Sequence, residues 1–151
     1  MIAHMSSRPR YESKADKDRE LQVIQRVGTM TKLEPKRLPE YSEADFAMLK
    51  DNRVVGVAEV KVRGKRYPQM FISLHKVQAL RDYASLGLAA RLVFALPDGV
   101  YVQEIGHPEI MGWIGYAGRT DRGDAQDTEM VVFYDTSGMR RLCDSDAGWF
   151  A

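Results

Sequence analysis

The hydrophobic pattern is clearest at residues 44–62, where the apolar runs "ADFAMLK" and "VVGVAEVKV" flank a short polar turn. Alternating apolar positions around Asp and Asn predict a β-hairpin. Successive strand side chains point to opposite faces, so Glu59 and Lys61 should share a face with Val55 and Val57. A carboxylate and an ammonium are then expected on the core-facing side, where a metal ion, a partner or a functional cleft must compensate them.

Helical periodicity marks two further segments. Residues 14–27 predict a helix that ends at Gly28 and carries acidic residues in its first half. A second helix is predicted from an N-cap at Ser73 to about Ala84, with Gly87 as the stop signal. Both helices have one apolar face, which indicates that each packs against a sheet.

Four more strands are predicted, a short one at 29–33 and longer ones at 90–96, 100–105 and 130–135. The basic segment "RGKRYPQ" at 63–69 contains Pro68 and is expected to be irregular, and a long polar loop precedes the last strand. Trp113 and Tyr116 are expected in the core, with a stacking platform for unpaired bases as the alternative.

The element order, helix, three strands, helix and two strands, predicts an α/β domain with a mixed central sheet flanked by helices. With 151 residues and no long linker, we expect a single domain at 14–151. Residues 1–13 are expected to form a flexible basic arm, and residues 1–5 are either native or an expression leader.

The first predicted helix carries a second unexpected carboxylate. Its apolar face contains Val23, Ile24 and Val27, and Glu20 falls within the same stripe by helical spacing. Glu20 either belongs to a functional site or bends out to solvent from the rim, and periodicity leaves these two alternatives about equal.

An acid-x-Lys sequence is common by chance, but Glu59–Lys61 lies inside an apolar strand with Asp45 on the strand before it. This arrangement resembles the PD-(D/E)xK nuclease superfamily, whose core runs α-β-β-β-α-β. The resemblance covers residues 14–105. Ala44 precedes Asp45 where the family motif often has proline.

The resemblance implies a role for each residue of this motif. Asp45 and Glu59 would hold Mg²⁺ or Mn²⁺ with the backbone carbonyl of Val60, and Lys61 would orient the attacking water or offset charge on the phosphate. Oxygen ligands suit Mg²⁺, which takes only one or two protein carboxylates and keeps several waters. Glu20 would be the additional acid near the metal that several members carry.

Further site residues are expected around the motif. The family often places a Lys or Gln of the following helix at the site, which here favours Gln78 over Lys76 as a catalytic residue. Arg63, Lys65 and Arg66 follow the motif directly and would contact the phosphate backbone together with Lys76. A solvated loop and a solvated helix face are the alternatives for these charges.

The hairpin register decides whether Asp45 and Glu59 can share a site. Directly opposed residues have a constant sum of positions, and Asp45 with Glu59 gives 104. A three-residue loop at 51–53 gives this sum, whereas a two-residue loop at 51–52 gives 103 and turns Asp45 away from Glu59. The site therefore predicts the three-residue loop.

Composition excludes some classes of function but does not identify one. The chain has 22 Lys and Arg against 21 Asp and Glu, so attraction to nucleic acid must come from a local patch. One cysteine and three scattered histidines do not suggest a zinc site, and the short apolar runs predict no membrane segment. A cytoplasmic location is the default expectation.

Together, these patterns predict a metal-dependent DNA nuclease of phage or bacterial recombination, repair or restriction. A non-catalytic nucleic-acid-binding or assembly module on the same fold is the alternative, and an α+β structural protein with Glu59–Lys61 as a surface pair is a third. DNA is the expected partner. Family members differ in oligomeric state, so a homodimer stays open.

Overall fold

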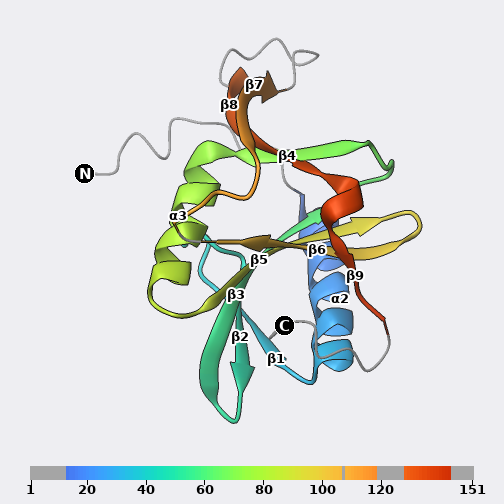
Figure 1. Cartoon of the computed structure of the whole chain (residues 1–151). Helices are drawn as coiled ribbons and strands as arrows, with labels where there is room; N and C mark the ends of the chain where they lie inside the picture. Colours follow the sequence, from blue (N-terminus) through green and yellow to red (C-terminus); the bar gives the residue numbers. More distant parts are fainter. Residues whose placement is uncertain (1–12, 107, 119–127, 144–151) are drawn as a thin grey trace.

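The computed structural model describes residues 13–106, 108–118 and 128–143 (Figure 1). The predicted N-terminal arm and most of the polar loop before the last long strand lie outside these residues. The described elements are α2 (Lys14–Thr31), β1 (Glu34–Arg37), β2 (Phe46–Lys50), β3 (Arg53–Val62), β4 (Gln69–Ser73), α3 (Leu74–Ser85), β5 (Ala89–Leu96), β6 (Gly99–Ile105), β7 (Trp113–Gly118), β8 (Thr128–Asp135), the 3₁₀ turn η2 (Thr136–Gly138) and β9 (Arg140–Arg141).

A six-stranded mixed sheet forms the centre of the fold, in the order β1-β2-β3-β5-β6-β9. β3 and β5 are parallel, and the other neighbouring pairs are antiparallel. The parallel pair needs a long crossover, which β4 and α3 supply. The predicted α/β class with a mixed central sheet and flanking helices is confirmed.

The two faces of the central sheet have separate apolar cores. α2 covers one face with Ile24, Val27 and Met30 against β2 and β3. The other face is covered by α3 and by a three-stranded antiparallel sheet in the order β4-β8-β7. Figure 1 shows α2 and this smaller sheet on opposite sides of the central sheet.

The smaller sheet was not predicted, because β4 and β7 lack a clear alternation of apolar and polar residues. In β4 only Met70 and Ile72 are buried, while Phe71 between them is exposed. Trp113 and Tyr116 of β7 are exposed, so the prediction that they lie in the core is wrong. β7 is the edge strand of this sheet, and its hairpin with β8 projects beyond the rest of the fold (Figure 1).

α2 continues past the predicted stop at Gly28 and ends at Thr31, with Lys32 in the left-handed conformation. The predicted strand at 29–33 is therefore wrong, because these residues complete the helix. A Cβ on Gly28 would lie 2.7 Å from the Leu33 carbonyl oxygen and 3.0 Å from Pro35 Cδ. Gly28 thus permits close packing of the chain that returns into β1, and it does not end the helix.

The hairpin between β2 and β3 has the two-residue loop Asp51–Asn52, with φ values of 50° and 64°. Two left-handed residues are typical of a type I′ hairpin turn. The predicted three-residue loop is therefore wrong. Next to the turn, the residue numbers of each opposed pair add up to 103, as in Lys50↔Arg53. From Met48↔Gly56 onwards they add up to 104, because a β-bulge leaves Val55 unpaired.

The bulge restores the register that the site requires, by a different route from the predicted one. It also turns Val55 toward the α2 side, whereas Val57 packs in the core on the α3 side. Val55 therefore does not share a face with Val57, as simple alternation predicts. Val57, Glu59 and Lys61 keep the expected alternation.

α3 begins directly after Ser73, as predicted, although the Ser73 side chain makes no capping hydrogen bond. Gly87 has a positive φ of 89° just after the helix, in agreement with its predicted role as a stop. None of the described helices is long and apolar enough to cross a membrane.

We predict that Gly28→Ala destabilises the protein by about 1–3 kcal/mol, because the added methyl group would meet backbone and proline atoms. Alanine normally stabilises a helix relative to glycine, so the sign of the effect is diagnostic. Urea unfolding would measure it. Gly64→Ala, where an added Cβ has no neighbour within 4 Å, is the matched control. A more stable Gly28→Ala protein would contradict the packing argument.

Candidate active site

A buried carboxylate lies at the centre of the candidate site. Glu59 of β3 is only 2% exposed. The Nζ atom of Lys61 lies 3.1 Å from Glu59 Oε2, and the Nζ atom of Lys76 lies 3.6 Å from Glu59 Oε1. Lys61 comes from the same strand and Lys76 from α3. The third alternative, a surface pair between Glu59 and Lys61, is excluded by this burial.

Asp45 lies directly before β2 and faces the end of β3. Its Oδ2 atom accepts a hydrogen bond from the Val60 N–H at 2.9 Å. Because β2 begins at Phe46, the Asp45 carboxylate takes the place of a strand partner for Val60. The N–H and C=O groups of one strand residue point to the same edge, so the Val60 carbonyl is also directed to this side.

A pocket of about 300 Å³ brings the predicted acids together, with side chains from α2, the segment before β2, β3 and α3. Its residues carry both signs of charge, in roughly equal numbers. They are Lys17, Glu20, Arg37, Leu38, Pro39, Glu40, Ser42, Ala44, Asp45, Glu59, Lys61 and Lys76. Glu20 thus lines the same pocket as Asp45 and Glu59.

The two central groups have shifted protonation equilibria. Burial, followed by the negative charge of Glu59, raises the pKa of Asp45 to about 6. The Val60 N–H and the charges of Lys61 and Lys76 act in the opposite direction. Burial acts to lower the pKa of Lys61, but the ion pair with Glu59 outweighs it and the pKa lies above its usual value. Lys61 is therefore a cation at neutral pH, and Asp45 takes up a proton at a higher pH than an ordinary aspartate does.

Of the two α3 residues considered, the structure brings Lys76 to the pocket and leaves Gln78 outside it. Gln78 is exposed. Residues two apart on a helix point about 200° away from each other, so only one of them can face the site. Lys76 also donates a hydrogen bond to the Glu43 carbonyl at 3.0 Å, which links α3 to the segment before Asp45. The preference for Gln78 is corrected on this geometry.

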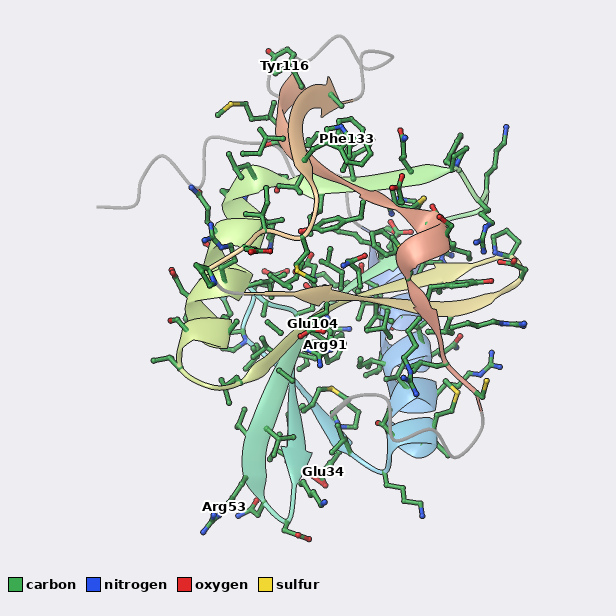
Figure 2. All side chains as sticks on the ribbon, viewed as in Figure 1. Glu34, Arg53, Arg91, Glu104, Tyr116 and Phe133 are labelled. Carbon is green, nitrogen blue, oxygen red and sulfur yellow. The ribbon has the colours of Figure 1, made fainter. Side chains whose placement is uncertain are left out.

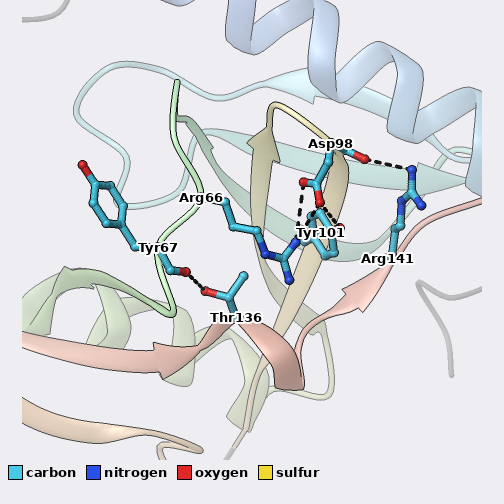
Figure 3. Close-up of polar contacts among 6 residues, drawn as sticks. All are labelled: Arg66, Tyr67, Asp98, Tyr101, Thr136 and Arg141. Atoms are coloured by element: carbon cyan, nitrogen blue, oxygen red, sulfur yellow. Dashed lines mark hydrogen bonds and ion pairs between the residues drawn. The ribbon is translucent and has the colours of Figure 1, made fainter.

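The predicted DNA-contacting cations have different surroundings. Arg66 is paired with Asp98 at 3.2 Å and stacks on the Tyr101 ring at 4.6 Å (Figure 3). Its guanidinium therefore fastens the 63–68 segment to the β5–β6 turn. Lys65 is exposed with its Nζ atom 5.3 Å from the centre of the Tyr67 ring. Arg63 follows the end of β3, and its N–H donates to the Ala95 carbonyl.

Two pocket cations were missed at the sequence level, Lys17 and Arg37. Lys17 pairs with Glu40, and Arg37 donates to the Lys17 carbonyl while stacking on the Phe46 ring. Lys17 lies one helical turn before Glu20, so its placement follows from that of Glu20. Arg37 had no comparable signal, because the strand that carries it is only four residues long.

The donor set at the pocket fits a hard divalent cation. Among the described residues, Glu59 Oε1 is buried without a hydrogen-bond partner, and Asp45 supplies a second carboxylate in the same pocket. Val60, which is buried in β3, is not among the described residues that line this pocket. Within the described part of the chain, no group of three Asp, Glu, His or Cys side chains is arranged to hold one ion. Glu20 therefore lines the pocket without completing such a group with Asp45 and Glu59.

The core with its two acids and a lysine at the ends of adjacent strands defines a PD-(D/E)xK nuclease fold. Among solved structures, the chain is similar to that of Archaeoglobus fulgidus Hjc, a Holliday junction resolvase from an archaeal hyperthermophile. The TM-score is 0.55 at 18% identity, and the match covers 85% of this chain and 92% of that one. No curated protein sequence matches the chain significantly.

The family assignment comes from a family model that matches residues 6–142 and is described as "Phage putative PDDEXK endonuclease". The match spans nearly the whole chain and includes Asp45, Glu59 and Lys61. The chain belongs to this endonuclease family, and the predicted membership in the PD-(D/E)xK superfamily is confirmed.

The raised pKa of Asp45 predicts how stability depends on pH without metal. The unfolded value is near 3.8 and the folded value near 6, so the folded state binds the proton more tightly. The stabilising contribution is present below about pH 4 and is lost as the pH rises through 6. Asp45→Asn should therefore become more stable than the wild type above pH 7, by about 1–2 kcal/mol after allowance for partial exposure.

Urea unfolding in a chelator at pH 4 to 8 would measure this difference. Asn keeps an oxygen that can accept the Val60 N–H, so the comparison isolates the charge. Asp82→Asn, which removes an exposed carboxylate from α3, is the control and should show no such trend. A gain for Asp45→Asn that is the same at all pH values would contradict the assignment.

Proposed function

We propose that the protein is a metal-dependent DNA endonuclease that hydrolyses phosphodiester bonds with Mg²⁺ or Mn²⁺. The observation that carries this proposal is the buried Glu59 carboxylate, which has one oxygen without a hydrogen-bond partner and lies beside Asp45 at a charged pocket. A non-catalytic module would have no need for such a group. The burial of a charged carboxylate is costly and requires a compensating role.

Asp45, Glu59 and the Val60 carbonyl are the groups that would hold the ion. A bound divalent ion lowers the pKa of a water molecule and offsets the charge of the phosphate. Asp45 and Glu59 lie on adjacent strands with a fixed register, so their oxygens are held in place before any ligand arrives. Glu20 contributes negative charge at the pocket and does not act as a ligand in this arrangement.

Lys61 is the residue placed to act on the reacting phosphate. Its ammonium is paired with Glu59 and is still 26% exposed, on the side of the pocket. In that position it can orient the attacking water or stabilise the charge that develops on the phosphate oxygens. Lys76 positions the Glu59 carboxylate, since its Nζ atom lies 3.6 Å from Oε1, the oxygen that Lys61 does not contact.

DNA as the substrate is supported by the family description and by the resolvase whose structure is similar. The family description names phage endonucleases, and we propose that this one acts in phage or bacterial DNA recombination, repair or restriction. Lys17, Arg37 and Lys76 supply positive charge at the pocket. Lys65, exposed on the segment after β3, would add to it. These cations are the expected contacts to the phosphate backbone.

A cleavage assay on single-stranded, duplex, flapped and four-way DNA tests the proposal, with Mg²⁺, Mn²⁺ or a chelator present. We expect cleavage of at least one substrate with either metal and none in the chelator. Glu59→Gln should abolish it. Metal-independent cleavage, or full activity of Glu59→Gln, would overturn the proposal.

We predict that Lys61→Ala reduces the cleavage rate by about 100-fold or more, because the lysine acts on charge that develops in the transition state. DNA affinity should change little. Single-turnover cleavage and equilibrium binding would separate these effects. Lys61→Gln, which keeps a hydrogen-bond donor toward Glu59, serves as a second variant if the alanine protein is unstable. Lys36→Ala removes an exposed lysine outside the pocket and is the control.

A third prediction concerns metal binding without DNA. Divalent ion should raise the melting temperature of the wild type, by an amount that corresponds to about 2.7 kcal/mol at an ion concentration 100 times the Kd. Glu59→Gln and Asp45→Asn should lose most of this shift, because each removes an anionic ligand. Equal shifts in the wild type and both variants would place the ion elsewhere.

A further inference from the structure

A second groove, of about 580 Å³, lies beyond the end of β3 at the edge of the smaller sheet. Its side chains include Arg63, Tyr67, Phe71 and Phe133, and we refer to it as the aromatic groove. None of the described residues that line it is acidic. Tyr67 is 50% exposed and Phe71 41% exposed, which is unusual for side chains of this size.

Two aromatic rings of this groove and the neighbouring Trp113 form a row across the sheet. Phe71 and Phe133 are directly opposed on β4 and β8, and Trp113 is directly opposed to Phe133 on β7. The ring centres of Phe71 and Phe133 are 5.6 Å apart, and those of Trp113 and Phe133 are 5.5 Å apart in a stacked geometry. All three rings lie on one face of the sheet, and Met70, Ile72, Val132 and Tyr134 on the opposite face are buried in the core.

The absence of a side chain at Gly115 lets the Phe133 ring lie close to β7. A Cβ on Gly115 would lie 2.6 Å from Phe133 Cε2, so the Phe133 ring lies directly against the backbone of β7. Figure 2 shows Phe133 at the base of the projecting hairpin and Tyr116 near its tip. Tyr116 belongs to the opposite face, because it alternates with Gly115 along β7.

The aromatic groove connects to the candidate active site through Arg63. Glu59, Lys61 and Arg63 are two residues apart in the sequence and therefore share one face of the strand. Arg63 extends the pairing with β5 by one residue. Burial lowers the pKa of Arg63, and the charges of Glu20 and Glu59 oppose this effect, so the guanidinium lies in the electrostatic field of both carboxylates. The distance along the strand from Glu59 to Arg63 is about 13 Å.

The chemistry of the groove fits nucleic acid more closely than another apolar surface. Lys65 lies over the Tyr67 ring, so cations alternate with exposed aromatic faces. Bases stack on aromatic side chains in a way that tolerates sequence, but only bases without a partner strand can do so. Arg66 does not add to this set, because Asp98 and Tyr101 already hold its guanidinium.

We propose that the aromatic groove binds unpaired nucleobases of the DNA strand that runs from the cleaved phosphodiester past Arg63. This inference rests on the proposed nuclease function and specifies its substrate as DNA with a single-stranded segment next to the cleavage point. Phe71, with its neighbour Phe133, supplies the stacking surface. Arg63 and Lys65 contact the phosphates between the two sites.

The test measures binding in a chelator, where cleavage is absent. A fluorescent oligothymidylate and a blunt duplex are titrated with the wild type, Phe71→Ala and Phe71→Leu. Both variants should bind the oligothymidylate about 5- to 100-fold more weakly, because each removes the aromatic face, whereas duplex binding should change less than twofold. Tyr116→Ala removes an exposed aromatic ring from the opposite face of the sheet and should behave as the wild type.

Three results would overturn the inference: unchanged binding of oligothymidylate, equal loss for single-stranded and duplex DNA, and self-association that Phe71→Ala abolishes without an effect on DNA. Phe71→Leu retains apolar volume, so it keeps the test valid if Phe71→Ala is unstable. Loss of single-strand binding in a protein that cleaves no DNA with metal would support the groove and contradict the nuclease proposal. Metal-dependent cleavage together with unchanged oligothymidylate binding by the Phe71 variants would support the nuclease proposal and contradict the groove.

Discussion

The requirement to keep one carboxylate charged inside the protein organises this structure. Glu59 is buried in a central strand, where only 2% of its surface is exposed. Lys61 of the same strand and Lys76 of α3 place positive charge beside this carboxylate. Helix α3 must therefore lie close enough to the central sheet for Lys76 to reach Glu59. The position of α3 is therefore constrained by a charge as well as by its apolar face. Ion pairs in such places seldom add stability relative to apolar residues, which favours a functional reason for this one.

The site also depends on where β2 begins. Had β2 begun before Phe46, its backbone would have paired with Val60 and closed the edge of β3. The strand instead begins late, and Asp45 supplies the acceptor that Val60 lacks. An unpaired strand edge is thus the origin of the pocket, and α2 and the segment before β2 form its walls.

Sequence patterns predicted the parts of this arrangement that depend on local periodicity. Alternation identified β3 with Glu59 and Lys61 on one face, and helical spacing placed Glu20 in the stripe that reaches the pocket. The end of α2 was predicted too early. Glycine often ends a helix, but Gly28 serves close packing and the helix continues past it to Thr31. Gln78 was preferred over Lys76, although the angle of α3 to the sheet decides which one reaches Glu59, and periodicity contains no information on that angle. The smaller sheet was missed because its edge strands expose their aromatic residues.

The β-bulge at Val55 separates the geometry of the hairpin tip from the geometry near Asp45. The turn at Asp51–Asn52 satisfies its own conformational preferences, and the bulge absorbs the one-residue offset before the chain reaches Met48 and Gly56. Changes in the sequence of the tip are thus insulated from the carboxylates. The tip is a region in which related chains can diverge, or a designer can graft a recognition loop, while the chemistry at the far end of the strands is retained.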